Sequence, residues 1–61
     1  MSLALDQIKP GVKIRQIAHP EYGDWVIRKF YASTTWEVDK VGSRDGIAVS
    51  EGELIKFWEL V

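Results

Sequence analysis

Apolar and polar residues alternate along most of this chain, in short runs separated by turn residues. A period of two residues is typical of strands that bury one face. The turns are marked by Pro10-Gly11, His19 to Gly23, Ala32 to Thr35 and the glycine-bracketed segment Gly42 to Gly46. The pattern therefore predicts five strands, at residues 12–18, 24–31, 35–41, 46–49 and 56–61.

The stretch from Gly23 to Tyr31 is apolar on both of its alternating faces. One face carries Val26, Arg28 and Phe30, and the other carries Trp25, Ile27, Lys29 and Tyr31. We expect Val26 and Phe30 to point inward, which leaves the second face outside. The predicted core is Val12, Ile14, Val26, Phe30, Val38, Ile47, Val49 and Leu54.

Helix signals occur at the two ends of the chain. Ser2 is a candidate cap for one helical turn that ends before Pro10. Ser50 and Glu53 have the spacing of a capping box. After them, apolar residues at helical spacing allow a helix to the C-terminus, whereas one turn near residues 51–54 followed by a strand at 56–61 is the alternative. The aromatic and β-branched tail favours the strand.

The predicted order of elements is that of an all-β, five-stranded small barrel with one helical turn before the last strand. Its opening reads Lys9-Pro-Gly-Val-Lys-Ile-Arg15, then Pro20-Glu-Tyr-Gly23, then Trp25-Val-Ile27. This pattern resembles the SH3-like small β-barrels, among them ribosomal and transcription-factor barrels with KOW motifs and a small barrel protein of the photosystem. The resemblance implies a single barrel domain over residues 1–61, with residues 1–8 as an N-terminal segment.

Two further barrel families differ from this chain at their functional motifs. The type II dihydrofolate reductases resemble it in length, but Ile47-Ala48-Val49-Ser50 stands where that family has Val-Gln-Ile-Tyr. Ala48 and Ser50 replace the Gln and Tyr that meet folate and nicotinamide, so the resemblance implies the architecture and not the activity. The Ala-Leu-Tyr-Asp-Tyr segment and Trp-Trp pair of peptide-binding SH3 domains are also missing from the sequence.

Composition excludes several classes of site. The chain has 61 residues, no Cys and one His, so we expect one domain without disulfides, metal or cofactor. A chain free of Cys is compatible with the cytoplasm, which is the location we expect. No apolar run approaches the roughly 20 residues that span a bilayer, so we expect no membrane partner.

The sequence offers little for catalysis. His19 lies in a turn beside Pro20, with Glu21 and Asp24 nearby, and no serine has a flanking motif that would activate it. Glu51 and Glu53 lie at a predicted helix start, where acidic residues match the helix dipole. We therefore expect a protein that is not an enzyme.

The apolar content predicts a contact surface. The chain has 24 large apolar side chains, and a barrel of this size encloses only about a dozen. We expect a non-enzymatic interaction module that binds a protein partner or a second copy of itself. The predicted contact residues are Tyr22, Trp25, Ile27, Lys29, Tyr31 and Trp58, with Phe57 as the alternative to Trp58. In a competing account, Leu3, Leu5 and Ile8 cover this face within one chain.

Nucleic-acid binding is the alternative function. The first two predicted strands carry Lys13, Arg15, Arg28 and Lys29, with Trp25 and Tyr31 on the second of them. Cations beside aromatic rings are the groups that bind single strands. The net charge of −1 and the neighbouring Asp24, Glu37 and Asp39 count against it.

Overall fold

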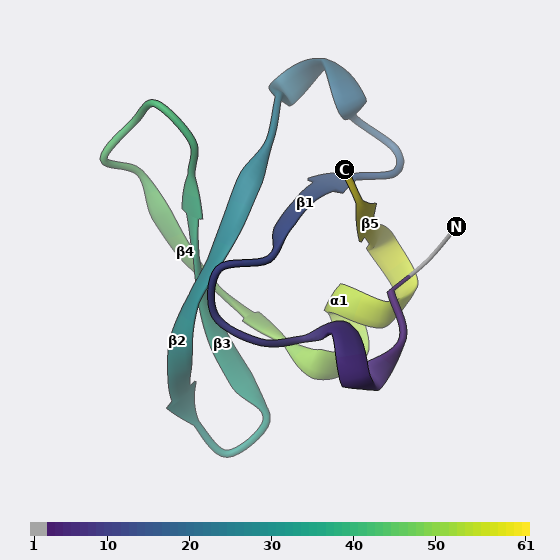
Figure 1. Ribbon diagram of the computed structural model, residues 1–61, viewed down its shortest axis with the longest axis vertical. Helices are drawn as coiled ribbons and strands as arrows, with labels where there is room; N and C mark the ends of the chain where they lie inside the picture. The colour runs from purple at the N-terminus through teal and green to yellow at the C-terminus, as the bar shows by residue number, and fades with distance from the viewer. Residues whose placement is uncertain (1–2) are drawn as a thin grey trace.

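The computed structural model describes residues 3–61, so the predicted cap Ser2 lies outside the described part of the chain. Five antiparallel strands form one sheet in the order β4-β3-β2-β1-β5 (Figure 1). The strands are β1 Lys13–Gln16, β2 Trp25–Ala32, β3 Thr35–Lys40, β4 Gly46–Ser50 and β5 Trp58–Leu60. The helix α1 is Glu51–Phe57, and the 3₁₀ turns η1 and η2 are Leu5–Gln7 and Pro20–Tyr22. No helix within residues 3–61 is long and apolar enough to cross a membrane.

All five predicted strands are present, with shorter ends at β1 and β5. The last part of the chain combines the two predicted continuations, because α1 extends to Phe57 before β5 begins. Ser50 caps this helix as predicted, since its Oγ accepts a hydrogen bond from the Glu53 N–H at 3.2 Å. The Ser50 hydroxyl also lies 3.3 Å from Glu53 Oε1.

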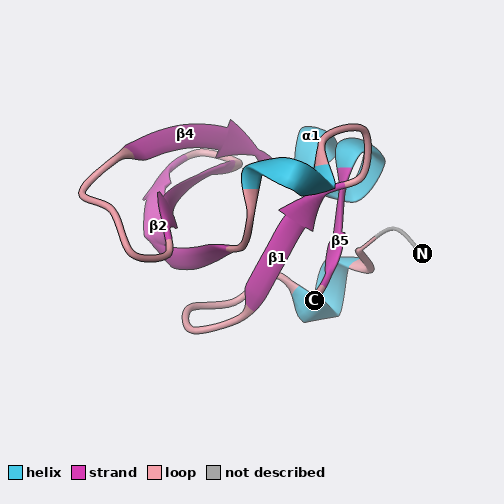
Figure 2. Ribbon diagram, turned by 90° about the horizontal axis from the view of Figure 1, so that it is seen from above, coloured by secondary structure: helices cyan, strands magenta, loops and turns pink. Residues whose placement is uncertain are grey.

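The sheet bends into two parts. Figures 1 and 2 show β2, β3 and β4 on one side of the molecule, and β1, β5, α1 and the N-terminal segment on the other. Within residues 3–61 the edge strands β4 and β5 do not pair with each other, so the sheet is not closed. The chain passes directly from β4 into α1, and this helix contacts both edge strands.

The core lies where the two parts meet. Its buried side chains come from all five strands, from α1 and from the N-terminal segment: Leu3, Ile8, Ile14, Trp25, Ile27, Val38, Val49, Leu54 and Trp58. The rings of Trp25 and Trp58 meet edge to face with centroids 5.6 Å apart. The predicted burial of Ile14, Val38, Val49 and Leu54 is confirmed.

The predicted orientation of β2 is wrong. Trp25 and Ile27 are 8% and 0% exposed, whereas Phe30 is 52% exposed and Val26 is only partly buried. The strand register gives the reason, because Trp25 lies opposite the buried Ile14 and Ile27 lies opposite the buried Val38. Both faces of this strand are apolar near its start, so alternation alone did not distinguish them.

Three other predicted positions also differ. Ile47 lies opposite Val38 on the edge strand β4 but is 42% exposed, whereas Val49 of the same strand, close to α1, is 4% exposed. Val12 packs against the core but is only partly buried, since it precedes the first residue of β1. Trp58 was expected outside and is buried, because it begins β5 at the edge-to-face contact with Trp25.

Candidate interaction surfaces

The predicted contact residues do not form one surface. Trp25, Ile27 and Trp58 belong to the core and are not available to a partner. Tyr22 is exposed in η2, where its ring stacks on His19 at 4.7 Å. Lys29 and Tyr31 are exposed on β2, on the other part of the sheet.

The N-terminal segment covers the Trp25 face from within the chain. Leu3 and Ile8 are buried in the same cluster as Trp25 and Ile27. The Leu3 N–H donates to the Trp58 carbonyl at 3.3 Å, which fixes the segment beside β5. The competing account is therefore correct for Leu3 and Ile8, whereas Leu5 remains exposed.

Three aromatic residues lie near the end of the β2–β3 hairpin, and we call them the aromatic hairpin surface: Phe30, Tyr31 and Trp36. Phe30 pairs with Trp36 across the strands, and their rings meet edge to face at 5.3 Å. The indole N–H of Trp36 donates to Glu51 Oε2 at 3.3 Å, which ties this ring to the start of α1. Phe30 and Tyr31 remain 52% and 67% exposed. Phe30 is thus largely uncovered beside a ring that is held in place, and Tyr31 is exposed on the outer side of the same hairpin, with Glu37.

Alternation through β2 predicts Phe30 in the core, but Phe30 is exposed because it lies near the end of the hairpin. The register shifts between Ile27 and Lys29, since Ile27 pairs with Val38 and Lys29 pairs with Glu37. Arg28 is the extra residue of a β-bulge, which returns Phe30 to the same face as Ile27. In the sequence, the two consecutive charged residues Arg28-Lys29 interrupt the alternation at this point, but the bulge itself is fixed by pairing with β3.

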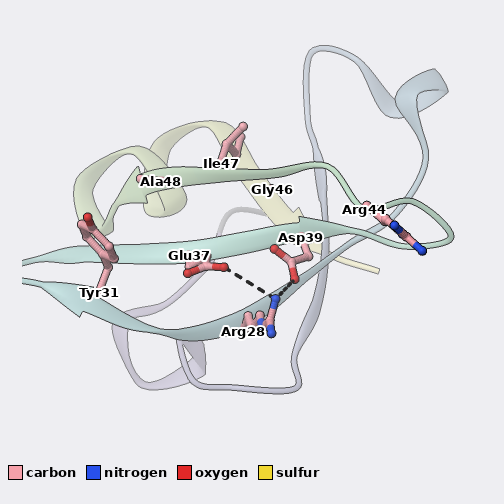
Figure 3. A pocket seen from close by; sticks show the side chains of 8 residues that line it. All are labelled: Arg28, Tyr31, Glu37, Asp39, Arg44, Gly46, Ile47 and Ala48. Carbon is pink, nitrogen blue, oxygen red and sulfur yellow. Dashed lines mark hydrogen bonds and ion pairs between the residues drawn. The ribbon is translucent and has the colours of Figure 1, made fainter.

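A groove lies beside the aromatic hairpin surface, on the outer face of β2, β3 and β4 (Figure 3). Its volume is about 420 Å³, and its lining is Arg28, Tyr31, Glu37, Asp39, Arg44, Gly46, Ile47 and Ala48. Figure 3 shows Arg28 between the carboxylates of Glu37 and Asp39, at 3.7 and 3.0 Å. A Cβ on Gly46 would lie 2.6 Å from Asp39 Oδ1, so the small residue there accommodates the ion pair.

The basic residues proposed for nucleic acid are mostly paired. Arg15 Nε donates to Glu59 Oε2 at 2.7 Å, and this guanidinium lowers the pKa of Glu59. Arg28 pairs with Asp39, and Lys29 Nζ lies 3.9 Å from Glu37. Trp25, the larger of the two rings suggested for stacking, is buried. The structure therefore pairs three of the four cations with carboxylates and buries one of the two rings.

His19 lies in an exposed turn and contacts Glu21, with Nδ1 3.1 Å from Oε2. A backbone hydrogen bond and this contact lower the pKa of Glu21. Residues 3–61 contain no group of three His, Asp or Glu side chains placed to hold a metal ion. The imidazole and carboxylate thus stabilise the turn that precedes β2.

Comparisons of the chain with family models, with curated proteins and with solved structures gave no match.

Proposed function

We propose that this protein is a non-enzymatic interaction module that binds a protein partner through the aromatic hairpin surface. The observation that carries the proposal is the edge-to-face pair of Phe30 and Trp36, with Phe30 and the adjacent Tyr31 both more than half exposed. Large aromatic rings are enriched in protein interfaces, where burial of each is favourable by about 1.5–3 kcal/mol. Glu51 holds Trp36 before any partner binds, so less side-chain freedom is lost on association.

We further infer that the fold is an SH3-like small barrel. The strand order supports this, because β1 lies between β2 and β5 in the sheet and α1 precedes the last strand. The open side between β4 and β5 is the point at which the described sheet departs from a closed barrel. A fold of this kind implies no particular activity, so the functional proposal depends on the aromatic hairpin surface alone.

The proposal is tested by capture experiments with immobilised protein and extract of the source cells. The test variant is Phe30→Ser with Tyr31→Ser, and the matched control is Phe57→Ser, which changes an exposed aromatic residue at the end of α1. We expect proteins that bind the wild type and the control in equal amounts and bind the double variant weakly, by quantitative mass spectrometry. Circular dichroism of all three proteins verifies that the fold is kept.

Equal capture by the wild type and the double variant would refute the proposal. Fluorescence anisotropy with labelled single-stranded oligonucleotides tests the nucleic-acid alternative. Binding at physiological salt that is lost on Arg28→Gln, and unchanged in the aromatic double variant, would favour that alternative.

A further inference from the structure

The two edge strands of the sheet, β4 and β5, differ in how far the rest of the chain covers them. At the β5 edge, the Leu3 N–H donates to the Trp58 carbonyl. At the β4 edge, no strand of residues 3–61 pairs with the side that faces away from β3. Figure 2 shows β4 along the margin of the molecule, with no other segment beyond it. One edge is thus partly covered by the chain itself, and the other is open.

The register identifies the backbone groups that line the open edge. The Lys40 N–H donates to the Asp45 carbonyl at 2.9 Å, and the Glu51 N–H donates to the Thr34 carbonyl at 2.7 Å. In an antiparallel ladder, successive residues direct their N–H and C=O groups to opposite sides. Residues 45, 47, 49 and 51 therefore face β3. Gly46, Ala48 and Ser50 direct their N–H and C=O groups outward.

This edge lacks the usual features that prevent strand pairing. Natural edge strands are commonly protected by Lys, by Pro or by a bulge. The segment Gly46-Ile-Ala-Val-Ser50 contains no charge and no Pro, and its register with β3 has no shift. The acidic residues that flank it are engaged within the chain, Asp45 with the Ser43 hydroxyl and Glu51 with the Trp36 indole.

We propose that β4 pairs with β4 of a second copy, antiparallel and about a two-fold axis at Ala48. In this register Ala48 lies opposite Ala48 of the second copy, and Gly46 lies opposite Ser50. The two Ala48 residues then exchange both of their N–H···O=C bonds, and each Ser50 N–H donates to the Gly46 carbonyl of the other copy. The Ser50 carbonyl already accepts the first hydrogen bond of α1. Because the contact is isologous, it closes at a dimer and leaves no edge strand for further growth at this site.

Side chains on the inner face of the sheet favour a second copy of this chain as the partner of β4. In the proposed register Ile47 lies opposite Val49 of the second copy, on the face that holds the core. Val49 already pairs with Trp36, and Trp36 pairs with Phe30. The exposed Ile47 would thus extend this apolar row across the axis to Val49 of the second copy. Because Ile47 and Val49 belong to the same strand, each copy contributes both residues to the contact.

The size of the contact predicts a reversible dimer. Stable interfaces bury about 1,200–2,000 Å² in total, and pairing of two five-residue strands alone falls below that range. We therefore expect association that rises with protein concentration. The dimer is held by the backbone of β4 with Ile47 and Val49, whereas the aromatic hairpin surface consists of side chains of β2 and β3. Each proposal can therefore fail without the other.

Sedimentation velocity over a wide concentration range tests the dimer. We expect the wild-type mass to rise from 7.0 kDa toward twice that value. Ala48→Pro should remain monomeric, because it removes an outward N–H and no hydrogen bond to β3. Ala48→Lys should also remain monomeric, because two like charges would face each other at the axis. Phe30→Ser is the control and should dimerise.

Mixing two charged variants tests the register itself. Ala48→Lys and Ala48→Glu should each be monomeric alone and should form a dimer when mixed, because opposite charges then meet at the axis. A wild type that stays monomeric at the highest concentration would overturn the proposal. A dimer that persists in Ala48→Pro would also overturn it and would place the contact elsewhere. Monomers that bind an added strand peptide would show that the edge serves a foreign partner instead.

Discussion

At the scale of single residues, Arg28 has the largest effect on the surface of this protein. As the extra residue of the bulge it places two cations, Arg28 and Lys29, opposite Glu37 alone. Arg28 also reaches Asp39, so the two cations and two carboxylates form one network on the outer face. Beyond the bulge, Phe30 lies past the end of the covered core. One inserted residue thus brings the charged groups of the groove together, and the position of Phe30 past the core leaves its ring exposed.

The cross-strand pair Val38 and Ile47 provides a test of burial at this scale. Val38 is fully buried, and Val38→Ala should lower the free energy of unfolding by about 1–3 kcal/mol through lost burial and cavity formation. Ile47 lies directly opposite on the edge strand and is 42% exposed, so Ile47→Ala should cost distinctly less. Urea unfolding at low protein concentration measures both values. Equal costs would show that Ile47 is covered in the folded monomer.

At the scale of elements, turn and cap residues determine where strands and helices begin and end. Ser50 ends β4 and caps α1 in one step, because its Oγ accepts from the Glu53 N–H while its backbone remains extended. The tight turn between β2 and β3 places Ser33 at a φ of 53°, in the left-handed region. Local chemistry of this kind thus fixes the ends of the elements, whereas the order of strands in the sheet depends on pairing between distant segments such as β1 and β5.

The start of α1 offers two substitutions with opposite expected effects. Ser50→Ala removes the cap and should destabilise the protein by about 1 kcal/mol. Gly52→Ala should stabilise it by up to about 1 kcal/mol, because alanine favours helix and nothing lies within 4 Å of the added Cβ. Thermal unfolding followed by circular dichroism measures both effects. A loss of stability on Gly52→Ala would contradict this description of the helix.

The elements could be predicted from the sequence because their signals are local. The local signals are the turn from Gly42 to Gly46, the helix cap formed by Ser50 with Glu53, and the alternation in 35–41. Each of them acts within a few residues. The faces of β2 could not be predicted, since Trp25 and Val26 are both apolar and the bulge at Arg28 depends on pairing with β3. The candidate surface was affected as well, because Trp25 is buried and Phe30, past the end of the core, is exposed. Tyr31 alone among the predicted aromatic contacts belongs to the proposed surface.

At the scale of the whole molecule, the N-terminal segment completes the core. A chain of 61 residues buries only about 60% of its unfolded surface, so each buried side chain is a large share of its stability. Leu3 and Ile8 lie in the same cluster as side chains of every strand and of α1. The backbone hydrogen bond from Leu3 to Trp58 joins the two ends of the described chain. The sheet alone does not enclose this core.

Leu3 and Leu5 therefore form a matched pair that tests the role of the segment. Leu3 is 2% exposed, and Leu3→Ala should cost about 2–5 kcal/mol, the range for leucine removed from a core. Leu5 is 62% exposed two residues later, and Leu5→Ala should change stability by less than about 0.5 kcal/mol. For a domain of this size each kcal/mol shifts Tm by roughly 4–8 °C, so a thermal scan separates the two variants clearly. If Leu3→Ala unfolded at the wild-type temperature, the segment would not be part of the core, and the Trp25 face would again be open to a partner.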